Sequence, residues 1–379
     1  MNAARIPFVD LRPADDAAAV EAAIRRVIDR GWFILGPEVE AFETEFAAAS
    51  GVRHAAGTGN GTDAIALCLR ALGVGPGDEV ITTPLSAAYT ALAIIMAGAR
   101  PVFADIDPER LTLDPIATER AVTSRTAAIL PVHLYGQPAD MPALVEVAER
   151  HGLVIVEDCC QAHLATCAGR PVGTYGAAGA FSFYPTKNLG ALGDAGAVVT
   201  TDGLLVERVK HLRNGGQTSR YHHVEPGVNS RLDEIQAAVL RARLPLLRRR
   251  TDERRTLAQA YRRQLGDAPV AVPPELDAGH VYHLFPVRSG DRPALQAHLA
   301  SAGIETLVHY PVPVPRQQAL ASTNPAECPV ADRVCSEVLS LPIHPLLRLQ
   351  DVDEVAGAVR GFGDGPQTAQ KEDGAWHEH

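Results

Sequence analysis

GAFSFYPTKNLGALGDAGAVVT, residues 179–200, places one lysine, Lys187, in an aromatic and glycine-rich run that contains no other cation. The apolar segments near its two ends, 180–183 and 197–200, have the length and composition of buried strands. A buried amine is costly unless a partner or a reaction uses it. One interpretation is a lysine paired with Asp194. The other is a desolvated amine that forms a Schiff base with a carbonyl, which a guanidinium cannot do.

Short apolar strands alternate with helices around this stretch. The predicted strands span 79–83, 101–105, 127–133, 153–158, 180–183 and 197–200. The predicted helices span 14–29, 38–49, 62–72, 87–97 and 139–151. Such an alternation indicates an α/β fold with a mostly parallel sheet covered on both faces. Ligands bind these sheets beyond the carboxyl ends of the strands.

The pattern changes in the last third of the chain. A long helix is predicted over 231–265, with a bend at Pro245. Two further strands, 281–287 and 306–312, flank a predicted helix at 292–302 and indicate a smaller α/β domain. The predicted division is a large domain over 1–245, a small domain over 246–363, and a polar, disordered tail over 364–379.

The composition, 46% hydrophobic and 21% charged, is typical of a soluble globular enzyme. The net charge of −10 argues against nucleic-acid binding, and the arginines between 241 and 263 alternate with acidic residues as on a solvated helix or a subunit contact. The longest apolar run, 91–99, is too short to span a membrane, and no signal-peptide core is present. The six cysteines form no Cys-x-x-Cys pair, so we predict no metal site and a cytoplasmic location.

The segment GTGNGTDAIALCLRALG, residues 57–73, leads small residues directly into a helical pattern. Free N–H groups at a helix N-terminus bind phosphate. Gly61 permits a close approach of an anion, and Thr62 adds a hydroxyl. The spacing matches neither the dinucleotide fingerprint nor a Walker loop. A plain turn with a helix cap is the alternative interpretation.

A second motif, LVIVEDCCQAH at 153–163, is a strand of the buried type that ends at Asp158. A carboxylate there could keep a pyridinium nitrogen protonated, and Gln161 could hydrogen-bond a ring hydroxyl, as in pyridoxal enzymes. A helix-capping aspartate is the alternative. Ser182, five residues before Lys187, could donate to a phosphate. A phosphate pocket, an acidic strand end and an isolated lysine together predict pyridoxal 5'-phosphate (PLP) as the cofactor.

These motifs also occur in an order that resembles a known family. The order is GNGTDA (59–64), EDCCQAH (157–163), FSFYPTKNLGALGDAGAVVT (181–200), GVNSRLDEIQAA (227–238) and HYPVP (309–313). Over nearly the whole chain it is similar to the DegT/StrS family of PLP-dependent sugar aminotransferases. The resemblance implies the fold of aspartate aminotransferase (fold type I), with a large domain built on a mostly parallel seven-stranded sheet and a smaller C-terminal α/β domain. It also implies a homodimer with two shared active sites.

The resemblance implies a role for each cofactor residue. Lys187 would form the Schiff base and carry the proton, Asp158 would pair with the pyridine nitrogen, and Gln161 would contact the ring 3-hydroxyl. The phosphate would be held by Gly61, Thr62, Ser182 and, from the partner subunit, Asn229.

Two further cofactor contacts follow from the same resemblance. His163 would lie beside the cofactor. Many relatives place an aromatic side chain against the ring at a position that falls on Ala87 in this chain, with Tyr89 two residues later. Either the small side chain or Tyr89 would therefore cover the ring.

The substrates implied by the resemblance are L-glutamate as amino donor and a nucleotide-linked keto sugar as acceptor. The sequence of these motifs is most similar to that of the branch that aminates carbon 3 of dTDP-linked 3-keto-6-deoxy sugars. The alternatives are amination at carbon 4, a cyclitol ketone, or a non-catalytic sugar-nucleotide sensor. The candidate substrate-binding residues, which could also be plain loop or strand-end residues, are Arg220, Tyr221, His222, His223, His309 and Tyr310.

Overall fold

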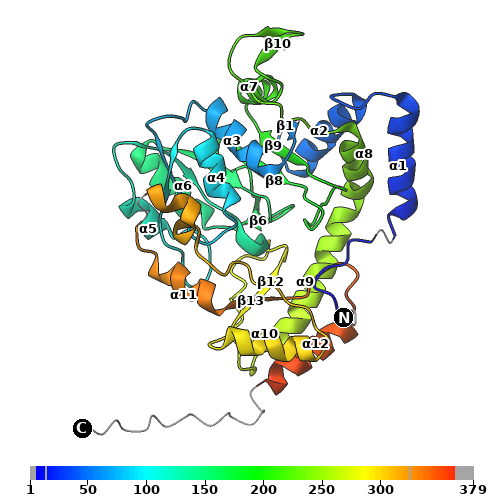
Figure 1. Cartoon of the computed structure of the whole chain (residues 1–379), viewed down its shortest axis with the longest axis vertical. Coiled ribbons are helices and arrows are strands. Elements are labelled where there is room, and N and C mark those ends of the chain that lie inside the picture. The colour runs from blue at the N-terminus through cyan, green and yellow to red at the C-terminus, as the bar shows by residue number, and fades with distance from the viewer. Residues whose placement is uncertain (1–5, 13–14, 324–325, 363–379) are drawn as a thin grey trace, which may run out of the picture.

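The computed structural model describes residues 6–12, 15–323 and 326–362, so the predicted tail at 364–379 lies outside the described residues. At its centre is a seven-stranded sheet of order β1-β9-β8-β5-β4-β2-β3 (Figure 1). β9 runs antiparallel to both of its neighbours and the other pairs are parallel, which confirms the mostly parallel sheet. The strands are β1 (His54–Thr58), β2 (Glu79–Thr82), β3 (Arg100–Phe103), β4 (Thr126–Leu130), β5 (Val154–Asp158), β8 (Ala178–Ser182) and β9 (Gly196–Thr200).

Helices cover both faces of this sheet. Successive side chains of a strand point to opposite faces, so neighbouring residues enter different cores. One core lies under α3, α4 and α7 and includes Val80, Ala128 and Val156. The other lies under α6 and includes Ile81, Ile129 and Ile155. The helices are α1 (Ala17–Arg30), α2 (Pro37–Ala49), α3 (Gly61–Ala71), α4 (Tyr89–Met96), α5 (Pro115–Arg120), α6 (Met141–His151) and α7 (Gly203–Arg213).

The predicted helix at 231–265 is two helices, α8 (Glu234–Arg243) and α9 (Leu247–Gln264), joined by a 3-10 turn at Leu244–Leu246. Pro245 lacks a backbone N–H and its ring crowds the preceding turn, so the predicted bend is confirmed. α9 runs from the sheet to the C-terminal elements (Figure 1).

The C-terminal elements are β12 (Phe285–Arg288), α10 (Arg292–Ser301), α11 (Pro329–Glu337), β13 (Val338–Leu341) and α12 (Leu349–Gly361). β12 pairs with β13 in antiparallel fashion. The predicted strand at 306–312 is wrong, because Leu307 makes an isolated bridge to Ser340 and Pro311 cannot donate to a ladder. The division into domains at 245/246 stays a prediction.

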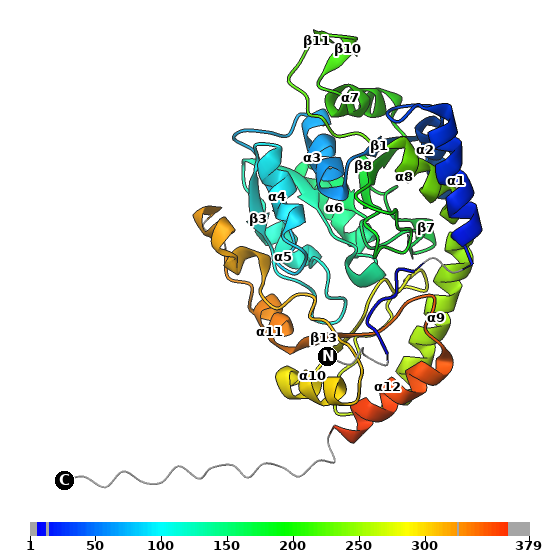
Figure 2. The same cartoon turned by 45° about the vertical axis from the view of Figure 1, so that its right-hand side comes forward.

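Two short hairpins complete the fold, β6 (Thr166–Cys167) with β7 (Arg170–Pro171) and β10 (Gln217–Ser219) with β11 (His222–His223). The β10–β11 hairpin projects beyond α7, away from the sheet (Figures 1 and 2). In the part of the chain that the structure covers, no helix combines the length and apolar character needed to cross a bilayer.

Candidate active site

A cavity of about 810 Å³ lies at the carboxyl ends of the parallel strands, next to the N-termini of α3 and α4. This is the edge of the sheet where ligands were expected. Most of the predicted site residues line it, namely Gly61, Thr62, Ala87, Tyr89, Asp158, Gln161, Ser182, Lys187, His309 and Tyr310. The fold therefore gathers at one place residues that are far apart in the sequence.

Lys187 reaches this cavity from the loop between β8 and β9. Its backbone N–H donates to Tyr184 O at 2.8 Å. The loop is tight, because a Cβ on Gly190 would lie 2.5 Å from Pro185 O. A short, closely packed turn therefore holds the lysine backbone in place.

Lys187 is half-buried on the cavity wall, and two nearby groups interact with its amine. Burial lowers the pKa of Lys187, and the nearby Cys160 and Asp158 partly oppose that shift. Asp194 lines the same cavity, but it is not among the groups that act on this pKa. No hydrogen bond or ion pair joins Lys187 to Asp194 in the described structure, so the interpretation of a lysine paired with Asp194 is not favoured. A lowered pKa makes an unprotonated, nucleophilic amine more accessible.

Asp158 ends β5 on the cavity side and is 4% exposed. Its Oδ2 accepts the hydroxyl proton of Thr90 at 2.8 Å, and its Oδ1 accepts the N–H of Cys160 at 3.1 Å. The two hydrogen bonds fix the carboxylate in one orientation. Neither Thr90 nor Cys160 was singled out as a site residue from the sequence, since Thr90 lies 68 positions away and nothing local marks it.

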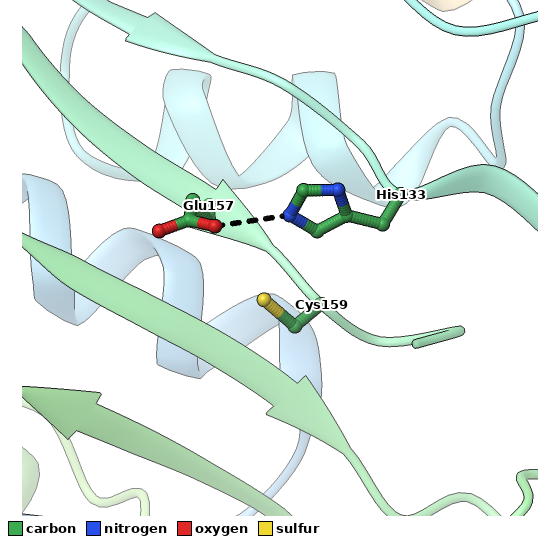
Figure 3. A group of neighbouring side chains, drawn as sticks. All are labelled: His133, Glu157 and Cys159. Atoms are coloured by element: carbon green, nitrogen blue, oxygen red, sulfur yellow. Dashed lines mark hydrogen bonds and ion pairs between the residues drawn. The ribbon is translucent and has the colours of Figure 1, made fainter. Parts of the chain in front are cut away.

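The neighbouring carboxylate, Glu157, points to the opposite face of the sheet and has a structural role. Nε2 of His133 donates to it at 3.1 Å (Figure 3). His133 Nδ1 accepts the N–H of Ala139, which assigns the imidazole proton to Nε2. The Cys159 thiol lies beside the pair, and burial raises its pKa. Three backbone N–H groups, at 2.7–2.8 Å, also donate to Glu157, and they belong to Gly173, Tyr175 and Gly176.

This buried group offers three atoms of metal-ligating types within 4.8 Å of one another. Hydrogen bonds already occupy both imidazole nitrogens and both carboxylate oxygens. We therefore interpret the group as a hydrogen-bond network that anchors the end of β5, and Asp158 with it.

The N-terminus of α3 forms the polar end of the cavity. Asn60 caps the helix by accepting the N–H of Asp63, which leaves the first N–H groups free. A Cβ on Gly61 would lie 2.7 Å from Ser182 Cβ and 2.8 Å from Cys160 Sγ. Only glycine lets the helix approach β8 this closely. Ser182 Oγ accepts the Tyr184 N–H at 3.3 Å, so its own proton is available to an anion.

Gln161 lies on the wall with Asp158, and the C-terminal segment contacts it there. Its Oε1 accepts the N–H of Tyr135 at 2.7 Å, and its Nε2 donates to the Tyr310 hydroxyl at 3.1 Å. His309 also lines the cavity, and burial, with the charge of Lys187, lowers its pKa to about 4.

Both candidates for covering a ring face, Ala87 and Tyr89, line the cavity. Tyr89 is 65% exposed at the start of α4. Tyr184, which was not among the predicted site residues, also lines the cavity. It is a further aromatic side chain there, and it is exposed. The choice between Ala87 and Tyr89 stays open.

Not every predicted residue reaches the cavity. His163 does not line it, because its ring is 1% exposed and packs against Phe181 and Phe183, behind the wall. Burial lowers the pKa of His163 to about 3. The structure therefore places His163 directly behind the cavity wall, and its expected contact with the cofactor stays a prediction.

The segment before α8 also stays outside the cavity of its own chain. Tyr221 is 77% exposed on the β10–β11 hairpin, and Asn229 pairs with Asn214 below it. Five predicted site residues on or near this hairpin do not line the cavity, namely Arg220, Tyr221, His222, His223 and Asn229.

The residues of the cavity fit PLP. The free N-terminus of α3 with Ser182 suits the phosphate, the buried carboxylate of Asp158 suits a protonated ring nitrogen, and Lys187 supplies an amine for the aldehyde. Gln161 retains one N–H for a ring hydroxyl, because an amide nitrogen has two donors.

Comparisons with known proteins identify the family to which the chain belongs. A model of the DegT/DnrJ/EryC1/StrS aminotransferase family matches residues 14–360. The dTDP-3-amino-3,4,6-trideoxy-alpha-D-glucose transaminase of Streptomyces venezuelae is 49% identical over 366 residues, which are 95% of this chain and 97% of the relative.

Solved structures give the same result. S. venezuelae DesV matches with a TM-score of 0.92 and 49% identity, over 95% of this chain and 99% of that one. NtdA from Bacillus subtilis with bound cofactor PMP matches with a TM-score of 0.90 and 31% identity, over 96% of this chain and 86% of that one. The chain therefore belongs to the DegT/DnrJ/EryC1/StrS aminotransferase family and is a PLP-dependent sugar aminotransferase.

Proposed function

We propose that this aminotransferase transfers the amino group of L-glutamate to carbon 3 of a dTDP-linked keto-6-deoxy sugar. The observation that supports it most is the meeting of a desolvated lysine amine, a fixed carboxylate and a free helix N-terminus in one cavity. Carbon 3 is favoured because the S. venezuelae relative, at 49% identity, is named for a 3-amino sugar on dTDP.

Each residue of the site has a separate task in this proposal. When bound, PLP supplies the electron sink and carries the amino group between the two substrates. Lys187 holds the aldehyde carbon between turnovers and then moves a proton through its Nζ, because its lowered pKa leaves an amine that can accept one. Asp158 keeps the ring nitrogen protonated, and the α3 N-terminus with Ser182 anchors the phosphate.

The proposal includes a homodimer with shared sites. Among the described residues no arginine lines the cavity, although a sugar nucleotide carries a diphosphate that needs cationic donors. The β10–β11 hairpin carries Arg220 and two histidines away from its own sheet (Figure 2). A partner subunit's hairpin could supply these groups, and Asn229 would follow it into the phosphate site.

The rim of the cavity fits the same arrangement. Tyr89, Met96 and Tyr184 are exposed there, although large apolar side chains are usually buried. A second copy that packs on this rim would cover them and exclude water from the reaction.

The test is a comparison of wild type, Lys187→Ala and the control Lys210→Ala, whose half-buried lysine is paired with Glu207 on α7. We expect the wild type to bind PLP with a visible colour that bleaches with L-glutamate, and borohydride to fix the cofactor on Lys187. Lys210→Ala should behave like the wild type. Lys187→Ala should keep its fold but lose both the bleaching by L-glutamate and the covalent fixation by borohydride. A Lys187→Ala protein that converts the cofactor at the wild-type rate would refute the role.

The acceptor is tested by amination of a panel of ketones by the glutamate-loaded enzyme. We expect dTDP-3-keto-6-deoxyglucose to be the best substrate. Faster turnover of a 4-keto nucleotide sugar or of scyllo-inosose would move the proposal to carbon 4 or to a cyclitol.

A further inference from the structure

The amide of Gln161 has a fixed orientation. Its Oε1 accepts the N–H of Tyr135 at 2.7 Å, so the oxygen and nitrogen of the amide cannot exchange places without losing that bond. Nε2 therefore faces the cavity side, where it donates one proton to the Tyr310 hydroxyl at 3.1 Å. The amide keeps one further N–H for a ligand.

The Tyr310 hydroxyl accepts this bond, so its own proton is left for another acceptor. Burial raises the pKa of Tyr310 to about 12, so the hydroxyl stays protonated at working pH. The titratable groups around it are Asp158 and Cys160 at the end of β5 and Tyr135, whose backbone N–H donates to Gln161. Tyr310 lines the cavity, and the free proton can be offered to whatever occupies it.

The position of Tyr310 is set by its neighbour. His309 O accepts the hydroxyl proton of Tyr135, and His309 Nδ1 is bonded to Ser340 Oγ at 3.0 Å. The His309 ring also stacks on Phe8, with ring centres 5.6 Å apart. The segment at 309–310 is thus tied to the wall of the large sheet at Tyr135 and Gln161, and to β13 at Ser340.

We propose that Tyr310 donates its hydroxyl proton to the same ring oxygen of the cofactor that Gln161 contacts, so that two donors from different parts of the fold clamp one oxygen. The inference rests on the proposed function, because it requires the ring of PLP beside Gln161. It gives Tyr310 a role in holding the cofactor, beyond the substrate contact expected from the sequence.

The test measures equilibrium binding to cofactor-free protein of pyridoxamine phosphate and of its analogue without the ring hydroxyl. These amines form no covalent bond with Lys187, so the measurement reports non-covalent contacts, and the difference between the two ligands reports the ring hydroxyl. Tyr310→Phe should bind pyridoxamine phosphate about tenfold more weakly, because one hydrogen bond to a ring oxygen is lost. Its affinity for the analogue should equal that of the wild type.

Tyr261→Phe is the matched control, since its hydroxyl is also buried but donates to Pro342 O, away from the cavity. It should leave both affinities unchanged. Equal losses for both ligands in Tyr310→Phe, or no loss for either, would overturn the inference. The proposed function fails separately, if the wild type binds neither ligand and is not bleached by L-glutamate.

Discussion

Thr90 Oγ1 donates a hydrogen bond of 2.8 Å to Asp158 Oδ2 from the first turn of α4. Both side chains are at most 4% exposed. The carboxylate that the proposal places on the ring nitrogen is therefore aimed by a hydroxyl from a different helix.

Replacing Thr90 with valine keeps the shape and removes this donor. Because hydrogen bonds to charged groups contribute about 1.5–3 kcal/mol, we expect Thr90→Val to weaken PLP binding roughly 10- to 100-fold. Equilibrium binding of PLP to cofactor-free protein checks this. Thr44→Val, at an exposed helical threonine that bonds only its own helix, is the control. A Thr90→Val protein with wild-type affinity would mean that the bond does not matter for the cofactor.

The proposed homodimer with shared sites predicts complementation between two inactive proteins. Lys187→Ala and Asn229→Ala should each be nearly inactive as homodimers. After mixing and re-equilibration, half of the dimers are mixed and one of their two sites contains both wild-type residues, so about a quarter of wild-type activity should return. Steady-state assays of the mixture measure it. No recovery despite exchanged subunits would place Asn229 in the site of its own chain.

The hairpin predicts a selective defect in acceptor binding. Arg220 lies over the Tyr221 ring at 5.1 Å in an exposed position, ready for an anionic ligand. Arg220→Ala should raise the KM for the nucleotide sugar roughly 10- to 100-fold, since a charge-assisted bond is lost. The half-reaction with L-glutamate should keep its rate. Arg263→Ala, on the exposed side of α9, is the control, and a matching loss in both half-reactions would argue against the hairpin as an acceptor site.

Acid should destabilise the protein through its buried histidines. Burial holds the pKa of His163 at about 3, below the unfolded value, so the unfolded chain binds a proton that the native state does not. The stability from this group is complete above the unfolded pKa and declines as the pH falls below it. Between pH 7 and pH 5 the free energy of unfolding should fall by about 2 kcal/mol for this residue.

Denaturant unfolding at both pH values, at one protein concentration, measures the effect. His163→Phe, which suits the space beside Phe181 and Phe183, should show a smaller loss than the wild type. An equal loss in the two proteins would show that His163 does not carry the acid sensitivity.

The features that were predictable from the sequence are local ones. Lys187 stands out because it is the one cation in an aromatic and glycine-rich run, and Asp158 because it ends a strand of buried type. β1 escaped prediction because HAAGT has no β-branched run, and its strand conformation depends on pairing with β9, whose partner residues lie 138 to 146 positions away. For the same reason β13, and not 306–312, pairs with β12. Thr90 and the tie between Gln161 and Tyr310 exist only after the chain has folded.

The β10–β11 hairpin has one more consequence. Its two strands pair only with each other within the described chain, so the seven-stranded sheet does not depend on them. Acceptor preference could therefore drift, or be transplanted from a relative, on a small appendage whose exchange leaves the catalytic scaffold intact. In a family that aminates many different sugars on one fold, changes in acceptor preference would then require few changes outside this hairpin.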